Sequence, residues 1–179
     1  KRMTLGELRN FSIEQSRGEF ICQWDDDDWY HKERIEKQME ELRRSNQSAC
    51  ILNYWIMFDE LKGLAYLSYP WCWPGTIIFR KKIFDEGHKY PSLSREEDTV
   101  FIRKLVKGND LVSFTCPHLY VYVIHGNNTW HRAHFDNLFG LSQRLSESFA
   151  KKVNEILSFK SHSSFTDAES NEISNLITH

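Results

Sequence analysis

The sequence lacks the features that mark several common classes of protein. Its four cysteines are widely spread and form no C-x-x-C pair, which argues against a zinc knuckle and against a dense disulfide framework. No apolar run approaches the ~18 residues that a membrane span requires, and no charged segment followed by an apolar one marks a secretion signal. These absences predict a soluble protein of a reducing, cytoplasmic compartment, and they leave peripheral attachment to a membrane open.

The sequence also lacks an excess of charge of either sign. Lysine and arginine together number 23 and aspartate and glutamate 25, for a formal charge of −2. Such a balance produces no field that favours nucleic acid, so no nucleic-acid partner is expected. With 179 residues and 40% hydrophobic side chains, the chain is long enough for one substantial core, and a single domain is the default expectation.

The pattern of apolar residues predicts an α/β fold with a mixed sheet flanked by helices. Helical periodicity covers residues 4–16, 31–47, 99–107, 134–157 and 167–177. Runs of strand-forming residues cover 20–24, 49–58, 64–68, 76–79 and 119–124, and the turn at 59–63 predicts a hairpin. In the second helix, Ile35, Met39 and Leu42 predict the stripe that packs on the sheet.

The most distinctive feature is the acidic run Asp25–Asp28, which directly follows the first predicted strand. Four adjacent carboxylates repel one another, so they either spread over a solvated turn or bind a cation. Taken alone, a solvated turn is the more common arrangement. The place of the run at the carboxyl end of a strand, where open α/β sheets bind ligands, favours a site instead.

The spacing of the run suits a hard divalent cation. Carboxylate oxygens select Mg²⁺ or Mn²⁺, and the alternating pair Asp25 and Asp27 supplies them compactly, with Asp27 as the first-choice ligand. Such an ion can hold a pyrophosphate and neutralise the charge that develops on a departing nucleoside diphosphate.

Three blocks of sequence stand out together. The first is Leu5-Gly6-Glu7-Leu8-Arg9-Asn10 with Arg17-Gly18-Glu19-Phe20-Ile21 and Trp24-Asp25-Asp26-Asp27-Asp28-Trp29; the second is Glu97-Asp98-Thr99-Val100-Phe101; the third is Tyr120-Val121-Tyr122-Val123-Ile124-His125-Gly126-Asn127-Asn128-Thr129-Trp130. Together they resemble family 2 glycosyltransferases, which have the GT-A fold, a Rossmann-like nucleotide-diphospho-sugar transferase fold. The order and spacing match those of the family, apart from His31, which stands where the family has a proline at the start of a helix.

The resemblance implies a set of site residues. Asp98 would be the general base that removes a proton from a sugar hydroxyl, with Glu97 orienting the acceptor or supporting the base. His125 would complete the metal shell or contact the diphosphate, although His131 and His134 lie close enough to compete. The residues expected to contact the nucleotide-sugar donor are Arg9, Asn10, Asp25, Asp26, Trp73 and Gly75, and those expected to hold Mn²⁺ or Mg²⁺ are Asp25, Asp27 and His125.

Several of these residues also have ordinary explanations. An acidic pair at the start of a helix is common for reasons of capping and dipole alone. Arg9 and Asn10 are as readily exposed or capping residues of an amphipathic helix. The loop Trp71-Cys72-Trp73-Pro74-Gly75 either stacks on a sugar or packs in the core.

The resemblance covers residues 4–140 and implies a domain organisation. Residues 1–140 are expected to form the carboxyl-terminal portion of a GT-A domain, and 141–179 a helical extension with a serine-rich joint at 159–166. The family's opening strand–helix–strand unit, which reads the nucleoside base, does not precede residue 1. A sheet without its first strands would expose an apolar edge, which predicts a truncated record, self-association or a partner chain that covers the edge.

The function implied is inverting, metal-assisted transfer of a sugar from a nucleotide-diphosphate donor, expected to be UDP-linked, to a hydroxyl of a glycan or lipid-linked acceptor. Two alternatives stay open. A non-catalytic fragment or carbohydrate-binding module would use the aromatic loop alone, and a metal-dependent phosphoesterase would use water in place of the sugar hydroxyl.

Overall fold

The chain folds into two compact units in a computed structural model, which describes residues 2–158 and 164–177. The first unit comprises the chain up to Trp24 together with Ile35–Ile51 and Cys72–Phe114. The second comprises Asp25–Arg34, Leu52–Trp71 and the chain from Thr115 onward. Each unit has its own sheet and its own hydrophobic core, and the predicted α/β class is confirmed.

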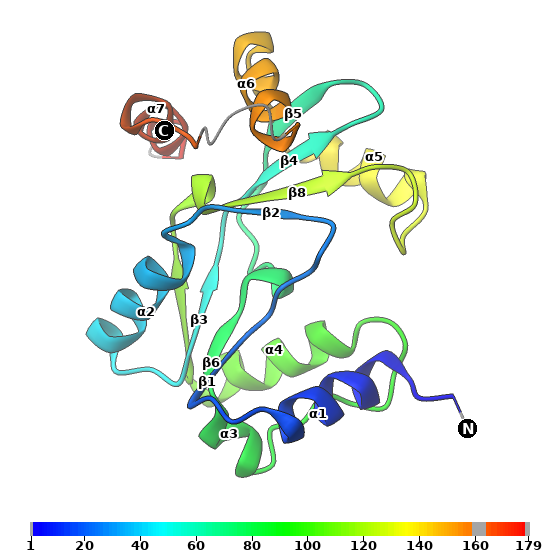
Figure 1. The fold of residues 1–179 in the computed structure, drawn as a ribbon, viewed down its shortest axis with the longest axis vertical. Helices are drawn as coiled ribbons and strands as arrows, with labels where there is room; N and C mark the ends of the chain where they lie inside the picture. The colour runs from blue at the N-terminus through cyan, green and yellow to red at the C-terminus, as the bar shows by residue number, and fades with distance from the viewer. Residues whose placement is uncertain (1, 159–163, 178–179) are drawn as a thin grey trace. The chain divides into compact units, whose positions relative to one another are not determined.

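The first unit is built around a four-stranded sheet with the order β1-β6-β3-β7. Strand β6 pairs antiparallel with both β1 and β3. In chain order the elements are α1 (Leu5–Gln15), β1 (Phe20–Cys22), α2 (Arg34–Ser45), β3 (Ala49–Leu52), the 3-10 turn η1 (Pro74–Thr76), β6 (Ile78–Arg80), α3 (Lys81–Asp85), α4 (Glu97–Gly108) and β7 (Leu111–Phe114). Figure 1 shows α1 and α4 running side by side, and their residues contact each other.

Helices cover both faces of this sheet because successive strand residues point in opposite directions. Ile51 and Phe79 face a core that α1, α3 and α4 complete with Ile13, Phe84 and Phe101. The alternate residues Cys50 and Ile78 are paired in register and equally buried. Gln38 of α2 covers that second face, because its amide Nε2 donates to the backbone oxygen of Thr76 at 2.9 Å and lies 3.5 Å from that of Cys50.

The second unit is built around a five-stranded mixed sheet with the order β2-β8-β4-β5-β9. Strands β4 and β8 are parallel, and the other pairs are antiparallel. The elements are β2 (Trp29–Tyr30), β4 (Ile56–Asp59), β5 (Leu64–Leu67), the 3-10 turn η2 (Pro117–Leu119), β8 (Tyr120–Ile124), α5 (Arg132–Gly140), β9 (Gln143–Arg144), α6 (Glu147–Leu157) and α7 (Asp167–Asn175). The predicted hairpin is confirmed as β4–β5, with Gly63 at φ 63° in its turn.

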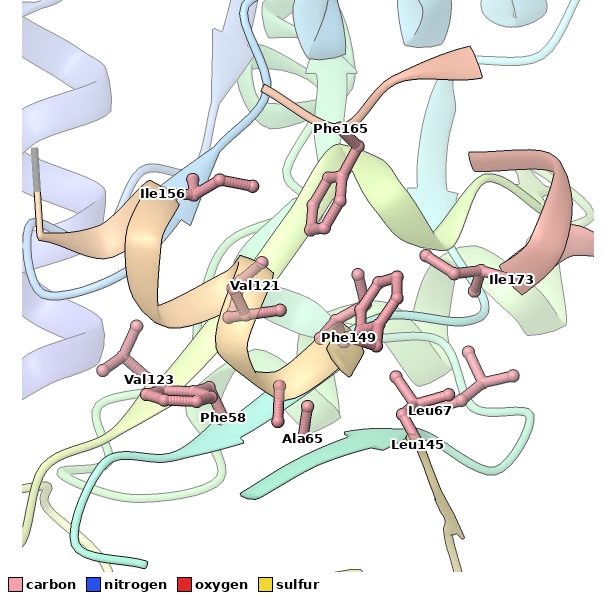
Figure 2. Close-up of a cluster of buried hydrophobic side chains, with 13 residues drawn as sticks. Phe58, Ala65, Leu67, Val121, Val123, Leu145, Phe149, Ile156, Phe165 and Ile173 are labelled. Carbon is pink, nitrogen blue, oxygen red and sulfur yellow. The ribbon is translucent and has the colours of Figure 1, made fainter. Parts of the chain in front are cut away.

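The core of the second unit lies between this sheet and the two carboxyl-terminal helices. Figure 2 shows Phe58, Val121 and Val123 of the sheet facing Phe149 and Ile156 of α6. The members of this core from the last part of the chain are Phe165 and Ile173, which are almost fully buried. Helix α5 packs on the opposite face, where Phe139 stacks on Tyr66 with the ring centroids 4.5 Å apart.

Two predicted elements are each divided in the structure. The strand predicted over 49–58 is two strands, β3 and β4, which belong to different sheets. The helix predicted over 134–157 is α5, the short strand β9 and α6. In the second region, Gly140 at the end of α5 and the N-cap residue Ser146 of α6 are local signals of the break that the prediction did not use. In the first region, strand-forming residues flank Asn53 on both sides, and local propensity does not show the break.

The buried face of α2 differs from the predicted stripe. Arg34, Gln38 and Leu42 are fully buried, whereas Ile35 is 47% exposed. Of the predicted stripe, Leu42 is confirmed and Met39 is half-buried, whereas Arg34 is buried in place of Ile35. The prediction counted only apolar residues, so it left out the buried polar residues Arg34 and Gln38. Val106, an apolar residue in the helix predicted over 99–107, is also exposed.

The other predicted elements agree with the structure within a few residues, whereas β2, α3 and β7 were not predicted. Strand β1 is shorter than the predicted 20–24 and is half-buried. Most of the predicted serine-rich joint, 159–163, lies outside the described residues. The boundary predicted at residue 140 stays a prediction, and β9 and α6 on its far side belong to the same compact unit as β4, β5 and β8. Among the helices that the structure describes, none has the length and apolar character of a membrane span.

Candidate functional site

The acidic run forms a turn in the second unit, immediately before β2. Its first and last members are attached to aromatic side chains. The backbone N–H of Asp25 donates to the hydroxyl of Tyr30 at 2.7 Å. The carboxylate of Asp28 accepts from the hydroxyl of Tyr120 and, at 3.0 Å, from the backbone N–H of Val123. Asp26 and Asp27 lie between these attachments and are exposed.

Asp28 differs electrostatically from the rest of the run. Burial raises its pKa to about 8, the bonds from Tyr120 and Val123 oppose that rise, and the charges of Asp27 and Asp25 add to it. Asp28 is therefore held as an anchor of the turn on β8, and its carboxyl keeps a proton more readily than an exposed one.

Asp27 is the member of the run that reaches the predicted histidine. Its Oδ2 lies 3.2 Å from Nε2 of His125, and Nδ1 of the same ring accepts the backbone N–H of Asn127 at 3.3 Å. In a neutral ring with Nδ1 as acceptor, the proton is on Nε2, so His125 donates to Asp27. To bind a cation through Nε2, the ring must move that proton to Nδ1 and give up the bond from Asn127.

The loop that carries His125 is fixed at both ends. The amide of Asn128 accepts the backbone N–H of His125 at 3.1 Å and donates to the backbone oxygen of Val123 at 3.0 Å. Gly126 adopts φ 86°, a conformation that favours glycine. These contacts give a physical reason for Gly126 and Asn128 in the H-G-N-N sequence, because both shape the turn after β8.

The far end of the loop is tied to β4. Nη1 of Arg132, at the start of α5, donates to Oδ1 of the fully buried Asp59 at 2.9 Å, and Nη2 bonds the second oxygen. These bonds raise the pKa of Arg132 above its ordinary value. Asp59 of β4 pairs in register with Ile124 of β8, the residue before His125. The loop therefore begins beside Asp59, and the ion pair with Arg132 brings its end back to the same residue.

These residues are suitable partners for a cation that arrives with a phosphate group. Within the described residues, no three His, Cys, Asp or Glu side chains gather as a complete protein cage for a metal. Mg²⁺ is commonly held by one or two carboxylates, with substrate phosphates and water completing its shell. A carboxylate and an imidazole that are already in contact fit such an open site, with Asp25 as the further oxygen predicted from the run.

The predicted base, Asp98, lies in the first unit at the start of α4. Its Oδ1 accepts the backbone N–H of Thr99 at 2.6 Å. Its Oδ2 has no hydrogen-bond partner in the described part of the chain, and the side chain is half-exposed. One carboxylate oxygen is therefore fixed by the helix, and the other is free to accept a proton.

Glu97, the residue before it, is in a different environment. Its side chain is 2% exposed, and its Oε1 lies 2.9 Å from Nε of Arg9 on α1. The next residue on α1, Asn10, donates to the backbone oxygen of Tyr90 at 2.8 Å and accepts its N–H at 3.0 Å. Arg9 and Asn10, predicted to contact the donor, thus hold the segment before Asp98.

The other two residues predicted to contact the donor lie in and beside η1. Gly75 is buried, and Trp73 is half-buried with its backbone oxygen accepting from Thr76 at 3.0 Å. Burial raises the pKa of the neighbouring Cys72 thiol. Roles of Trp73 and Gly75 in sugar binding stay predictions.

The structure thus assembles the predicted site residues in two groups. Asp25, Asp26, Asp27 and His125 belong to the second unit, and the remainder, Arg9, Asn10, Trp73, Gly75, Glu97 and Asp98, to the first. Sequence reasoning assigned no holding role to the residues that keep these groups in place: Asp28, Tyr120, Asn128, and the Asp59–Arg132 pair. Asp28 and Asn128 stand within the acidic run and the H-G-N-N run, but nothing in the sequence distinguished them from their neighbours.

A family model of glycosyl transferase family 2 matches residues 1–90, a span that contains the α1 motif, the acidic turn and η1. The chain belongs to this family. The predicted base and the loop of His125 lie beyond the matched span. No curated protein matches the sequence.

Solved structures of S. aureus TarS 1–349 share the family fold. One of them matches with a TM-score of 0.50 and 16% identity over 88% of this chain and 52% of that one. A structure of TarS 1–349 in complex with UDP-GlcNAc matches with a TM-score of 0.51 and 18% identity over 87% of this chain and 54% of that one. The predicted GT-A fold is confirmed by this similarity, and the chain spans about half the length of the structures it matches.

Proposed function

We propose that this protein transfers a sugar from a UDP-linked donor to a hydroxyl group of a glycan or lipid-linked acceptor, with inversion at the anomeric carbon. The observation that carries the proposal is the contact of Asp27 with His125 at 3.2 Å, in a turn anchored to β8, in a chain of glycosyl transferase family 2. A TarS structure of the same fold was obtained in complex with UDP-GlcNAc, which supports a nucleotide-sugar donor.

Asp27 and His125 are the proposed ligands of a Mn²⁺ or Mg²⁺ ion, with Asp25 as a further oxygen and Asp26 beside the donor. When bound, the ion would neutralise the negative charge of the departing diphosphate. The chain's own contribution is to hold Asp27 between two anchored neighbours, Asp28 on β8 and His125 on its fixed loop.

Asp98 is the proposed base. Its free Oδ2 takes the proton of the acceptor hydroxyl as the oxygen bonds to the anomeric carbon and the bond to the UDP oxygen breaks. A carboxylate fixed through one oxygen by the helix keeps the other in a constant direction, which favours in-line attack.

Calorimetric titration of UDP in the presence and absence of Mn²⁺ tests the metal site in the full-length protein. Asp27→Asn should weaken Mn²⁺-dependent UDP binding by about 10- to 100-fold, as losses at metal sites commonly do. The matched control is Asp85→Asn, an exposed aspartate on α3 that pairs with Lys81 at the surface and should change nothing. Absence of Mn²⁺-dependent binding in the unaltered protein would favour the carbohydrate-binding module.

Asp98→Asn tests the base separately from binding. The amide cannot accept the proton, so kcat for UDP release from UDP-GlcNAc should fall by about 10²- to 10⁴-fold while UDP affinity is unchanged. Full activity in this variant would remove Asp98 from the mechanism. Release of free sugar at the full rate without an acceptor would indicate a hydrolase instead.

A further inference from the structure

The segment from Tyr90 to Glu97, which leads into Asp98, is held by three residues on one side of α1. Gly6, Arg9 and Asn10 recur at helical spacing and all contact this segment. We propose that these three residues, with Glu97, position the base Asp98 and do not bind the nucleotide. The inference rests on the proposed function, because it assigns a second layer of residues to the same reaction.

The first contact is a shielded ion pair. Glu97 is 2% exposed and Arg9 18% exposed, so the pair at 2.9 Å is little screened by solvent. Breaking such a pair leaves a buried charge without its counterion, which is far more damaging than losing a surface pair. Glu97 is the residue before Asp98, so its buried bond to Arg9 also restrains the first turn of α4.

The second contact is a close approach of two backbones. The N–H of Gly6 donates to the oxygen of Leu93 at 2.9 Å, and a Cβ on Gly6 would lie 1.9 Å from the oxygen of Pro91. Only glycine allows this approach without a shift of the backbone. Gly6 therefore sets the distance between α1 and the segment before the base.

The third contact occupies the side chain of Asn10. Its amide oxygen and nitrogen both bond to the backbone of Tyr90, at 3.0 and 2.8 Å. The ring of Tyr90 stacks on Phe101 of α4 with the centroids 4.3 Å apart, and the guanidinium of Arg9 lies 5.7 Å from the same ring. Both polar atoms of the Asn10 side chain are thus bonded to Tyr90. Through the ring of Tyr90, α1 is connected to α4 a second time.

The start of α4 needs external support. Glu96, its N-cap residue, adopts φ 61°, a left-handed conformation that is strained for a residue with a side chain, and it makes no side-chain cap bond. Within the turn, Asp98 accepts the backbone N–H of Thr99, but the N-cap residue adds no side-chain bond of its own. Arg9 and Asn10 supply the contacts that keep the turn in place.

Arg9→Met tests the proposal in the full-length protein, since methionine keeps much of the length and removes the charge. We expect kcat for UDP release from UDP-GlcNAc to fall at least about tenfold, because small misplacement of a base is costly. KM and the calorimetric affinity for UDP with Mn²⁺ should stay within twofold. A tenfold loss of UDP affinity with kcat unchanged would make Arg9 a nucleotide contact and overturn the proposal.

Two further variants separate positioning from general loss of structure. Glu97→Gln keeps the shape of the side chain and should reproduce the loss of kcat in a milder form. Lys89→Met removes an exposed ion pair of 2.7 Å with Glu14, which joins the same helix to the residue just before this segment, and it should leave kcat within twofold. An equal loss of kcat in Lys89→Met and Arg9→Met would show that any weakening of the contact between α1 and this part of the chain lowers kcat. That result would overturn a specific role for Arg9.

Hydrogen exchange supplies a readout that does not depend on activity. In Arg9→Met the amides of Val100 and Phe101, the first in α4 with helical hydrogen bonds, should exchange at least about tenfold faster, while those of α2 are unchanged. Unchanged exchange at Val100 and Phe101 would overturn the proposal even in an active enzyme. If the unaltered protein neither binds UDP nor turns over UDP-GlcNAc, the proposed function fails, whereas the exchange comparison still decides whether Arg9 holds the turn.

Discussion

At the scale of single residues, Asp28 combines a structural role with an electrostatic cost. Its carboxyl is buried against β8 and bonded to Tyr120 and Val123, and burial raises its pKa to about 8. In the unfolded chain an aspartate titrates near its ordinary value of about 3.9. The folded state therefore holds a proton on Asp28 over a range of pH in which the unfolded state does not.

This difference predicts a fall in stability with rising pH in metal-free protein. The contribution of protonated Asp28 is fully present below about pH 4 and is lost as the pH rises towards about 8, because the folded state then has to ionise a buried carboxyl. Asp28→Asn keeps a neutral group of the same shape, and it should remove this part of the pH dependence. Thermal unfolding in EDTA from pH 4 to 8 measures it.

We expect the Asp28→Asn variant to unfold at least about 2–4 °C higher than the unaltered protein at pH 8, which corresponds to about 1 kcal/mol for a chain of this size. At pH 4 the two proteins should agree closely. A constant difference between them at every pH would mean that Asp28 does not titrate in this range.

At the scale of elements, α1 depends on the glycine that lets it approach the segment before α4. Gly6→Ala places a Cβ 1.9 Å from a backbone oxygen that belongs to a different part of the chain. Relief requires α1 or the segment to move, so the free energy of unfolding should fall by about 1–3 kcal/mol, as overpacking commonly costs. Chemical denaturation of the variant measures this loss.

Gly140→Ala is the matched control for that substitution. Gly140 is also helical, in α5, and a Cβ there meets nothing within 4 Å. Alanine favours helix over glycine by up to about 1 kcal/mol, so the stability should be unchanged or slightly higher. If both variants lose stability equally, the contact with Pro91 is not the cause.

The scale of elements also shows why some segments were predicted correctly and others were not. Helix α1 begins where Thr4 and Glu7 form a capping box, and the turn after β8 follows from Gly126 and Asn128. These signals are local and readable. The division of 49–58 has no local signal, because it depends on which sheet each half joins.

At the scale of the whole molecule, the carboxyl-terminal helices belong to the core of the second unit. Phe165 stacks on Phe149 of α6 with the centroids 5.4 Å apart and meets Trp29, next to the acidic turn, edge to face at 5.6 Å. Ile173 of α7 is fully buried in the same cluster. The last part of the chain thus supports the strand that follows the proposed metal site.

Phe165→Ala should therefore destabilise the second unit strongly. Removal of a buried phenylalanine side chain costs about 3–5 kcal/mol. Leu141→Ala is the control in the same unit, because Leu141 is 68% exposed and its loss should change stability by less than about 0.5 kcal/mol. Hydrogen exchange at the amides of β8 and β4 reports the local loss, and protection equal to that of the unaltered protein would contradict the packing role.

The sequence by itself determined the fold class, most of the helices and strands, and the residue types of the candidate site. Those features depend on local periodicity, capping and motif spacing, which are written in neighbouring residues. Only the tertiary structure decided which side chains within a motif are exposed and which are buried and keep the motif in place. Asp28 and Asp27 are adjacent and chemically identical, and the adjacent Glu97 and Asp98 differ by only one methylene group. They differ because one of each pair is buried against a distant partner, Tyr120 or Arg9, and spacing along the chain does not encode burial against distant partners.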